Sequence, residues 1–98
     1  MAHRVSSRAE ADLDEIWLYV AEESGSTHTA DHLIDTITQR FLLLATFPYV
    51  GRLHEQELGV GRRSWPVGEY AIVYCVEGED VLILRVVHGR RQLPALFE

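Results

Sequence analysis

The chain has 98 residues, 47% of them hydrophobic, and a formal net charge of −6. This length predicts one small domain over residues 1–98, and the hydrophobic content is too high for a disordered chain. An acidic body repels phosphate backbones, which argues against tight unaided binding to nucleic acid. The sequence shows no apolar run as long as a membrane span and no signal peptide, and its single cysteine excludes an internal disulfide. These features predict a cytoplasmic protein of bacterial type.

The charges are distributed unevenly. Residues 1–61 contain 4 arginines and 10 acidic residues, whereas residues 62–98 contain 5 arginines and 5 acidic residues. All 9 basic residues are arginine. Arginine favours planar, bidentate recognition, but its very high pKa makes it a poor proton shuttle. The basic groups are therefore better suited to recognition than to proton transfer.

A short strand and an amphipathic helix are predicted at the start of the chain. Residues 2–5 can form the strand, and a capping box of Ser7 and Glu10 begins a helix that ends near residues 24–26. Apolar residues repeat at helical spacing along its core stripe: Ala9, Leu13, Ile16, Trp17 and Val20. The acidic residues, including Asp12, are expected to form a solvated face rather than a metal site.

A second helix is predicted from Ser26 or Thr27 to a point before Pro48. Its apolar stripe consists of Ala30, Leu33, Ile34, Ile37, Phe41, Leu44 and Ala45. His28 and His32 are four residues apart, as metal ligands on one helix face are, but no motif supplies a third ligand, so no metal is expected. Leu43 falls on the polar side. It is either a single exposed leucine or part of a partner contact.

Three strands are predicted after a polar connection over residues 53–61. They cover residues 62–67, 70–76 and 81–87 and form an antiparallel meander. The middle strand is apolar on both faces and is therefore expected at the centre of the sheet, with Cys75 as a buried, inert thiol; Pro66 is expected at an edge or a bulge. The predicted fold is a two-layer α+β domain of order β-α-α-β-β-β, with a helical hairpin on one sheet face.

Four segments carry a resemblance to a known family: "RAEADLDEIWLYVAEESGS", "FPYVGR", "RRSWPVGEYAIVYCV" and "ILRVVHGRRQLPALF". In this order and spacing they resemble the ParE toxins of the ParE/RelE superfamily, over nearly the whole chain. The resemblance implies the same fold, no cofactor, and a role in a type II toxin–antitoxin system. In such a system a stable toxin is held inactive by a cognate antitoxin protein encoded beside it.

RelE-like members of the superfamily are ribosome-dependent messenger-RNA endonucleases. Their chemistry needs a base, an acid and cationic groups for the charge that develops on the phosphate. Where that pattern has alternating basic residues on the first meander strand, this chain has Arg62 and Ser64, and Ala71 replaces the arginine expected after the strand tyrosine. Arg90 matches the basic residue at the end of the last strand. The catalytic set under this alternative reading would be Arg62, His88 and Arg90.

His88 is the one acid–base candidate near the end of the last strand, although a structural role is the more common one for a histidine in that place. Strict alternation predicts that His88 shares a sheet face with Leu82, Leu84 and Val86. Arg85 is then expected on the other face with Val81, Ile83 and Val87. Amid these apolar neighbours Arg85 needs an internal acceptor, because an unpaired buried charge is costly.

ParE-like members instead inhibit DNA gyrase, which needs a binding surface and no catalytic set. Arginine and tryptophan are favoured anchors of such surfaces. The expected target-binding residues are Arg62, Arg63, Trp65, Arg90 and Arg91, and the expected antitoxin contact is Leu43. Each arginine can equally be a solvated strand end. A non-enzymatic gyrase inhibitor is the leading hypothesis, with a messenger-RNA endonuclease, or a toxin-fold protein that has lost its toxicity and acts in autoregulation, as alternatives.

Overall fold

The computed structural model describes residues 2–89. The elements in chain order are β1 (His3–Val5), α1 (Ser7–Ser24), α2 (Thr27–Thr46), β2 (Arg52–Leu53), α3 (Glu55–Leu58), β3 (Arg62–Val67), β4 (Tyr70–Glu77) and β5 (Asp80–His88). The predicted α+β order of a strand, two helices and a three-stranded meander is confirmed. The connection over residues 53–61 is more regular than predicted, because it contains α3 and the second residue of the short strand β2.

The strands form one five-stranded sheet in the order β1-β5-β4-β3-β2. β1 runs parallel to β5, and the other neighbours are antiparallel. β4 is the middle strand and its first five residues are buried, as its two apolar faces predict. β2 pairs only with Arg63 and Ser64, so Pro66 lies where β3 has no outer neighbour and its missing N–H leaves no bond unmade.

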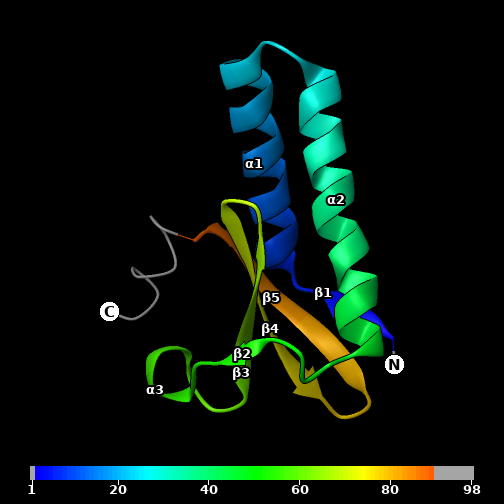
Figure 1. Cartoon of the computed structure of the whole chain (residues 1–98), viewed down its shortest axis with the longest axis vertical. Coiled ribbons are helices and arrows are strands. Elements are labelled where there is room, and N and C mark those ends of the chain that lie inside the picture. Colours follow the sequence, from blue (N-terminus) through cyan, green and yellow to red (C-terminus); the bar gives the residue numbers. More distant parts are fainter. Residues whose placement is uncertain (1, 90–98) are drawn as a thin grey trace.

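The helical hairpin of α1 and α2 covers one face of the sheet (Figure 1). The loop between the helices lies at the end of the hairpin away from the sheet, so the distal turns project beyond it (Figure 1). The N-cap of α1 lies one residue before the predicted one: the Ser6 side chain, not that of Ser7, accepts the bond from the Ala9 N–H. Ser26 caps α2 in the same way, and α2 begins at Thr27, where its start is predicted.

Two apolar clusters sandwich the sheet. The larger one joins the hairpin to the sheet and contains Ala9, Ile16, Ile37, Phe41, Leu44, Val67, Tyr70, Ile72, Tyr74, Val81, Ile83 and Val86. The smaller one lies on the other face and contains Leu58 of α3 with Ala71, Val73 and Val87. The small helix α3 therefore covers part of the face that the hairpin leaves open.

Trp17 does not take the core position that its spacing predicts. Its side chain is only partly buried, and its Nε1–H donates to Asp31 Oδ1 of α2 at 2.7 Å. An indole has one polar edge that needs a partner when it leaves water, and the outer surface of the hairpin supplies one. Trp17 thus links the two helices at their surface rather than packing against the sheet.

A β-bulge in β5 reverses the predicted alternation of its side chains. Val73 pairs with Arg85 but its neighbour Tyr74 pairs with Ile83, so Leu84 is an extra residue in β5. As a result Val86 packs with Val81 and Ile83 on the helix side, whereas Leu84 and Val87 lie on the other side. The prediction that Val86 shares a face with Leu84 is wrong, because one inserted residue exchanges the faces of all that follow it.

Candidate interaction surface

The three predicted target-binding residues of β3 are divided between the two faces of the sheet. Arg62 pairs with Cys75, Arg63 with Tyr74, and Trp65 with Ile72. Directly opposite residues share a face, so Arg63 and Trp65 lie on the helix side with Tyr74 and Ile72, and Arg62 lies on the other side. The structure does not bring the three into one patch. Arg90 and Arg91, the other two predicted residues, lie outside the described residues.

Arg63 is engaged within the domain. Its Nη1 donates to the carbonyl oxygens of Tyr49 at 3.2 Å and Gly51 at 2.8 Å, and its guanidinium lies 5.2 Å from the centre of the Tyr49 ring. The Gly51 N–H in turn donates to the hydroxyl of Tyr74 at 2.8 Å. Burial raises the pKa of Tyr74, which keeps this hydroxyl neutral. Arg63 therefore holds the turn between α2 and β2 on the sheet.

The Arg63→Gln variant is expected to lose about 1–3 kcal/mol of unfolding free energy, because the carbonyl contacts and the ring contact are lost together. Urea denaturation followed by circular dichroism measures this cost. Arg62→Gln is the control, since the exposed Arg62 side chain should leave the midpoint unchanged. Equal midpoints for the two variants would contradict the structural role of Arg63.

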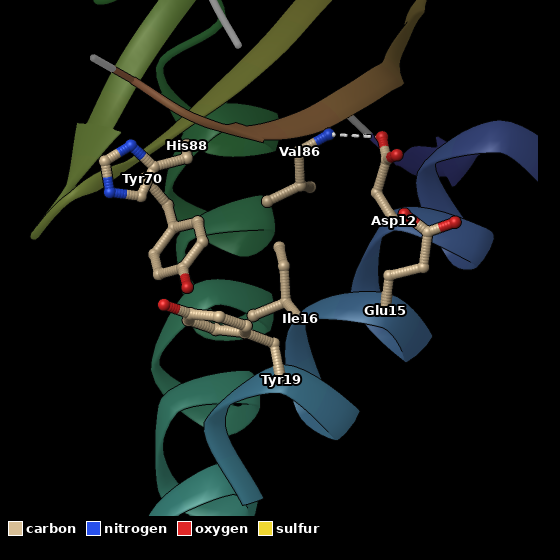
Figure 2. Close-up of a pocket in the computed structure, with 7 residues that line it drawn as sticks. All are labelled: Asp12, Glu15, Ile16, Tyr19, Tyr70, Val86 and His88. Carbon is tan, nitrogen blue, oxygen red and sulfur yellow. Dashed lines mark hydrogen bonds between the residues drawn. The ribbon is translucent and has the colours of Figure 1, made fainter. Parts of the chain in front are cut away.

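His88 is the last residue of β5, and its side chain lies on the helix side of the sheet, whereas Arg62 lies on the other side. Its ring packs edge-on against Tyr70 at a centroid distance of 5.6 Å, and its Nε2 lies 3.7 Å from Glu69 Oε2. The ring faces a pocket that α1 also lines (Figure 2). His88 pairs with Tyr70 at one end of β4, whereas Arg62 pairs with Cys75 toward the other. The structure does not bring these two members of the alternative catalytic set together.

Arg85 has the internal acceptor that the sequence requires, and the acceptor is Asp12. Arg85 Nε donates to Asp12 Oδ2 at 2.8 Å and Arg85 Nη2 to Asp12 Oδ1 at 3.2 Å. Oδ2 also accepts the backbone N–H of Val86 at 3.0 Å. Asp12 is only 4% exposed, so its expected place on a solvated face is wrong. A carboxylate this buried is stable because a bidentate arginine and a backbone donor satisfy it.

The buried pair of His54 and Ser64 was not predicted. His54 Nε2 lies 2.8 Å from Ser64 Oγ, and His54 Nδ1 lies 3.9 Å from Glu57 Oε2. The pair joins the residue before α3 to the middle of β3, on the face that carries the smaller apolar cluster. The sequence does not indicate this contact, because it forms only when β2 pairs with β3. The contact fixes α3 against the sheet.

Exposed apolar side chains extend from the end of α2 to the strand β2. They are Leu42, Phe47, Tyr49, Val50 and Leu53, with Val60 after α3. Leu43, the predicted antitoxin contact, is partly buried, and the exposed leucine of this turn is Leu42, which is 62% exposed. Exposed apolar side chains around a short edge strand are typical of a protein-binding surface.

The single cysteine and the metal-ligand residues are the remaining candidates for chemistry within residues 2–89. Cys75 is less buried than predicted, and burial, with Glu77 beside it, raises its thiol pKa, which disfavours the nucleophilic thiolate. Across residues 2–89 no group of three or more histidine, cysteine or acidic side chains is placed to hold a metal ion. None of the helices in this part of the chain is long and apolar enough to cross a membrane.

Solved structures with the same fold come from toxin–antitoxin systems. A chain of the chromosomal ParDE system of P. aeruginosa superposes with a TM-score of 0.78 at 22% identity, over 90% of this chain and 95% of that one. A chain of the RelBE2 toxin–antitoxin complex of Mycobacterium tuberculosis gives a TM-score of 0.60 at 23% identity, over 89% and 95%. At these identities the likeness establishes the fold.

Sequence comparison establishes the family. Toxin ParE3 of Caulobacter vibrioides is 36% identical over 86% of this chain and 82% of its own length. Toxin ParE1 of the same organism is 34% identical over 88% of this chain and 86% of its own. The family model for the ParE toxin of the type II toxin–antitoxin system parDE matches residues 4–93. This chain therefore belongs to the ParE toxin family of type II toxin–antitoxin systems.

Proposed function

We propose that this ParE-family toxin acts in the cytoplasm by binding DNA gyrase and inhibiting it, without catalysing a reaction itself. The observation that carries the proposal is the chemistry of the sheet face on which Arg62 lies. Ser64 and Ala71, which replace two basic residues of the RelE pattern, are both buried there. Ser64 is bonded to His54, and Ala71 packs in an apolar cluster with Val73. RNA cleavage needs cationic groups at the phosphate, and these two positions offer none.

Arg62 is the best placed of the described candidates for contact with gyrase. Its side chain is exposed, and among residues 2–89 no acidic group lies within ion-pair distance of it. Arg90 and Arg91 follow β5 in the sequence and complete the predicted basic set. Trp65 is partly buried on the helix side of β3, so it is a weaker candidate. Arg63 is not proposed as a gyrase contact, because its guanidinium is bonded to the turn between α2 and β2.

Neutralising the basic set should weaken inhibition of gyrase without unfolding the toxin. Each of Arg62→Gln, Arg90→Gln and Arg91→Gln is expected to raise the toxin concentration needed to inhibit supercoiling by purified gyrase. One buried charge-assisted contact contributes about 1.5–3 kcal/mol, or roughly ten- to a hundredfold in affinity. Arg8→Gln is the matched control, because it removes the same charge from the exposed surface of α1.

The competing functions predict different results in the same experiments. Induction of the wild-type toxin without antitoxin should stop DNA synthesis before translation. An arrest of translation first, with message cleavage that His88→Gln abolishes and gyrase left unaffected, would establish the ribonuclease. No growth effect from a folded, soluble protein would establish a chain that has lost its toxicity.

We further propose that a cognate antitoxin neutralises the toxin by covering the hairpin and crossing or pairing with the sheet. Exposed apolar side chains from Leu42 to Leu53, with Leu43 beside them, supply a surface for such a segment. A segment that orders on binding offsets its entropy cost by a large contact area. Hydrogen exchange should therefore slow in α1, α2 or the sheet edges when the antitoxin is added. Unchanged exchange throughout these elements would contradict this mode of neutralisation.

A further inference from the structure

A pocket of about 270 Å³ opens between α1 and the end of β5. Its floor is apolar and consists of Ile16 and Val86. Figure 2 shows the rings of Tyr19 and Tyr70 at one end of this floor and the carboxylates of Asp12 and Glu15 at the other. The pocket is therefore long and amphipathic, and its size suits a single extended side chain rather than a helix.

The free charge of the pocket is that of Glu15. Asp12 is already neutralised by the bidentate contact with Arg85. Within the described part of the chain, no basic group lies within ion-pair distance of the Glu15 carboxylate, and its side chain is exposed. An unpaired carboxylate beside an apolar floor attracts a cation that can bury an aliphatic stem.

The surface around the pocket also combines exposed apolar and acidic side chains. Leu18 and Tyr19, exposed by 54% and 50%, lie on α1 beside the exposed acidic residues Asp14, Glu22 and Glu23. A partner that covers this helix must therefore present apolar groups together with positive charge. Charge complementarity of this kind selects partners and fixes their register.

We propose that the pocket receives the side chain of one arginine or lysine from the antitoxin. The aliphatic stem lies on Ile16 and Val86 with the tyrosine rings beside it, and the cationic group reaches the Glu15 carboxylate. Burial of the stem and a charge-assisted hydrogen bond at the carboxylate act together in this position. That the side chain comes from the antitoxin rests on the proposed function, whereas the preference of the pocket for a cation does not.

The preference for a cation can be measured without any partner protein. The probes are Nα-acetyl-arginine amide and Nα-acetyl-citrulline amide, which have nearly the same shape but differ in charge. In NMR titrations the arginine probe should shift the amide signals of residues 15–19 and 86–88 at least about fivefold more strongly than the citrulline probe. Glu15→Gln should remove this difference, and Glu22→Gln, which removes an equal charge from α1 outside the pocket, should keep it.

The second measurement is the affinity for the cognate antitoxin. Glu15→Gln is expected to weaken it roughly ten- to a hundredfold, as one charge-assisted contact would. Glu79→Gln, which removes an equal charge from the exposed turn between β4 and β5, is expected to weaken it by less than about twofold. The proposal is overturned if both variants bind the antitoxin equally well, or if the citrulline probe binds the pocket as the arginine probe does. It is also overturned if the arginine probe binds only to Arg90→Gln or Arg91→Gln, because the chain's own arginine would then be the occupant. A wild-type toxin that binds no antitoxin would instead refute the proposed neutralisation.

Discussion

Asp12→Ala is expected to lower the free energy of unfolding by about 3–5 kcal/mol, the usual cost of removing one partner from a buried ion pair. The loss has two parts. Arg85 keeps its charge without the carboxylate that its Nε and Nη2 contact, and the Val86 N–H loses its acceptor at 3.0 Å. For a domain of this size the cost approaches the whole stability. Urea denaturation of the purified variant, with antitoxin absent, measures it.

A double-mutant cycle separates the ion pair from the rest of this effect. Arg85→Met removes the guanidinium, and Asp12→Ala in that background should cost much less than in the wild type, because no buried positive charge is left behind. Some cost should persist, since the Val86 N–H still lacks its acceptor. Arg8→Ala is the matched control: Arg8 Nε lies 3.8 Å from Asp12 Oδ1 but its side chain is 63% exposed, so its removal should be nearly neutral. Equal costs for Asp12→Ala in both backgrounds would refute the pairing.

The long periodic elements of this fold could be predicted from the sequence, and the reason is local. Apolar spacing over four or more turns indicates α1 and α2, and runs that are apolar on both faces indicate the central position of β4. Even the need of Arg85 for a buried acceptor follows from its apolar neighbours. The identity of the acceptor does not, because Asp12 lies 73 positions away and looks like any acid between the apolar residues of a helix.

Several of the missed features depend on pairing between strands. The strand β2 has only two residues and exists because β3 lies beside it, and the His54–Ser64 contact depends on that pairing. The bulge at Leu84 carries no compositional mark such as glycine, yet it decides that Val86 packs beneath α1. A site argument based on strict alternation therefore fails at the end of β5, where the candidate functional residues lie.

Gly51→Ala is the other substitution expected to have a large effect. A Cβ atom at this position would lie 2.5 Å from Tyr74 Oη, 2.7 Å from Tyr74 Cε1 and 2.9 Å from the backbone oxygen of Ser64. Tyr74 is fully buried in the main core and Ser64 O belongs to β3, so neither can move aside freely. The turn must shift instead, which also breaks the 2.8 Å bond from the Gly51 N–H to the Tyr74 hydroxyl. Together these changes should cost about 3–5 kcal/mol.

Two comparisons test whether this cost comes from crowding. Gly25→Ala places a Cβ where nothing lies within 4 Å, so only its left-handed backbone at φ 68° is penalised, by about 1–2 kcal/mol. In the Tyr74→Phe background, Gly51→Ala should cost less than in the wild type, because the contact with Tyr74 Oη and the hydrogen bond to it are already gone. The contacts with Tyr74 Cε1 and Ser64 O remain, so part of the cost should remain too. Melting midpoints of the four proteins of this cycle, with Gly25→Ala beside them, measure each step. A Gly51→Ala midpoint no lower than that of Gly25→Ala would show that the turn between α2 and β2 yields freely, and that Arg63 and Tyr74 do not hold it on the sheet.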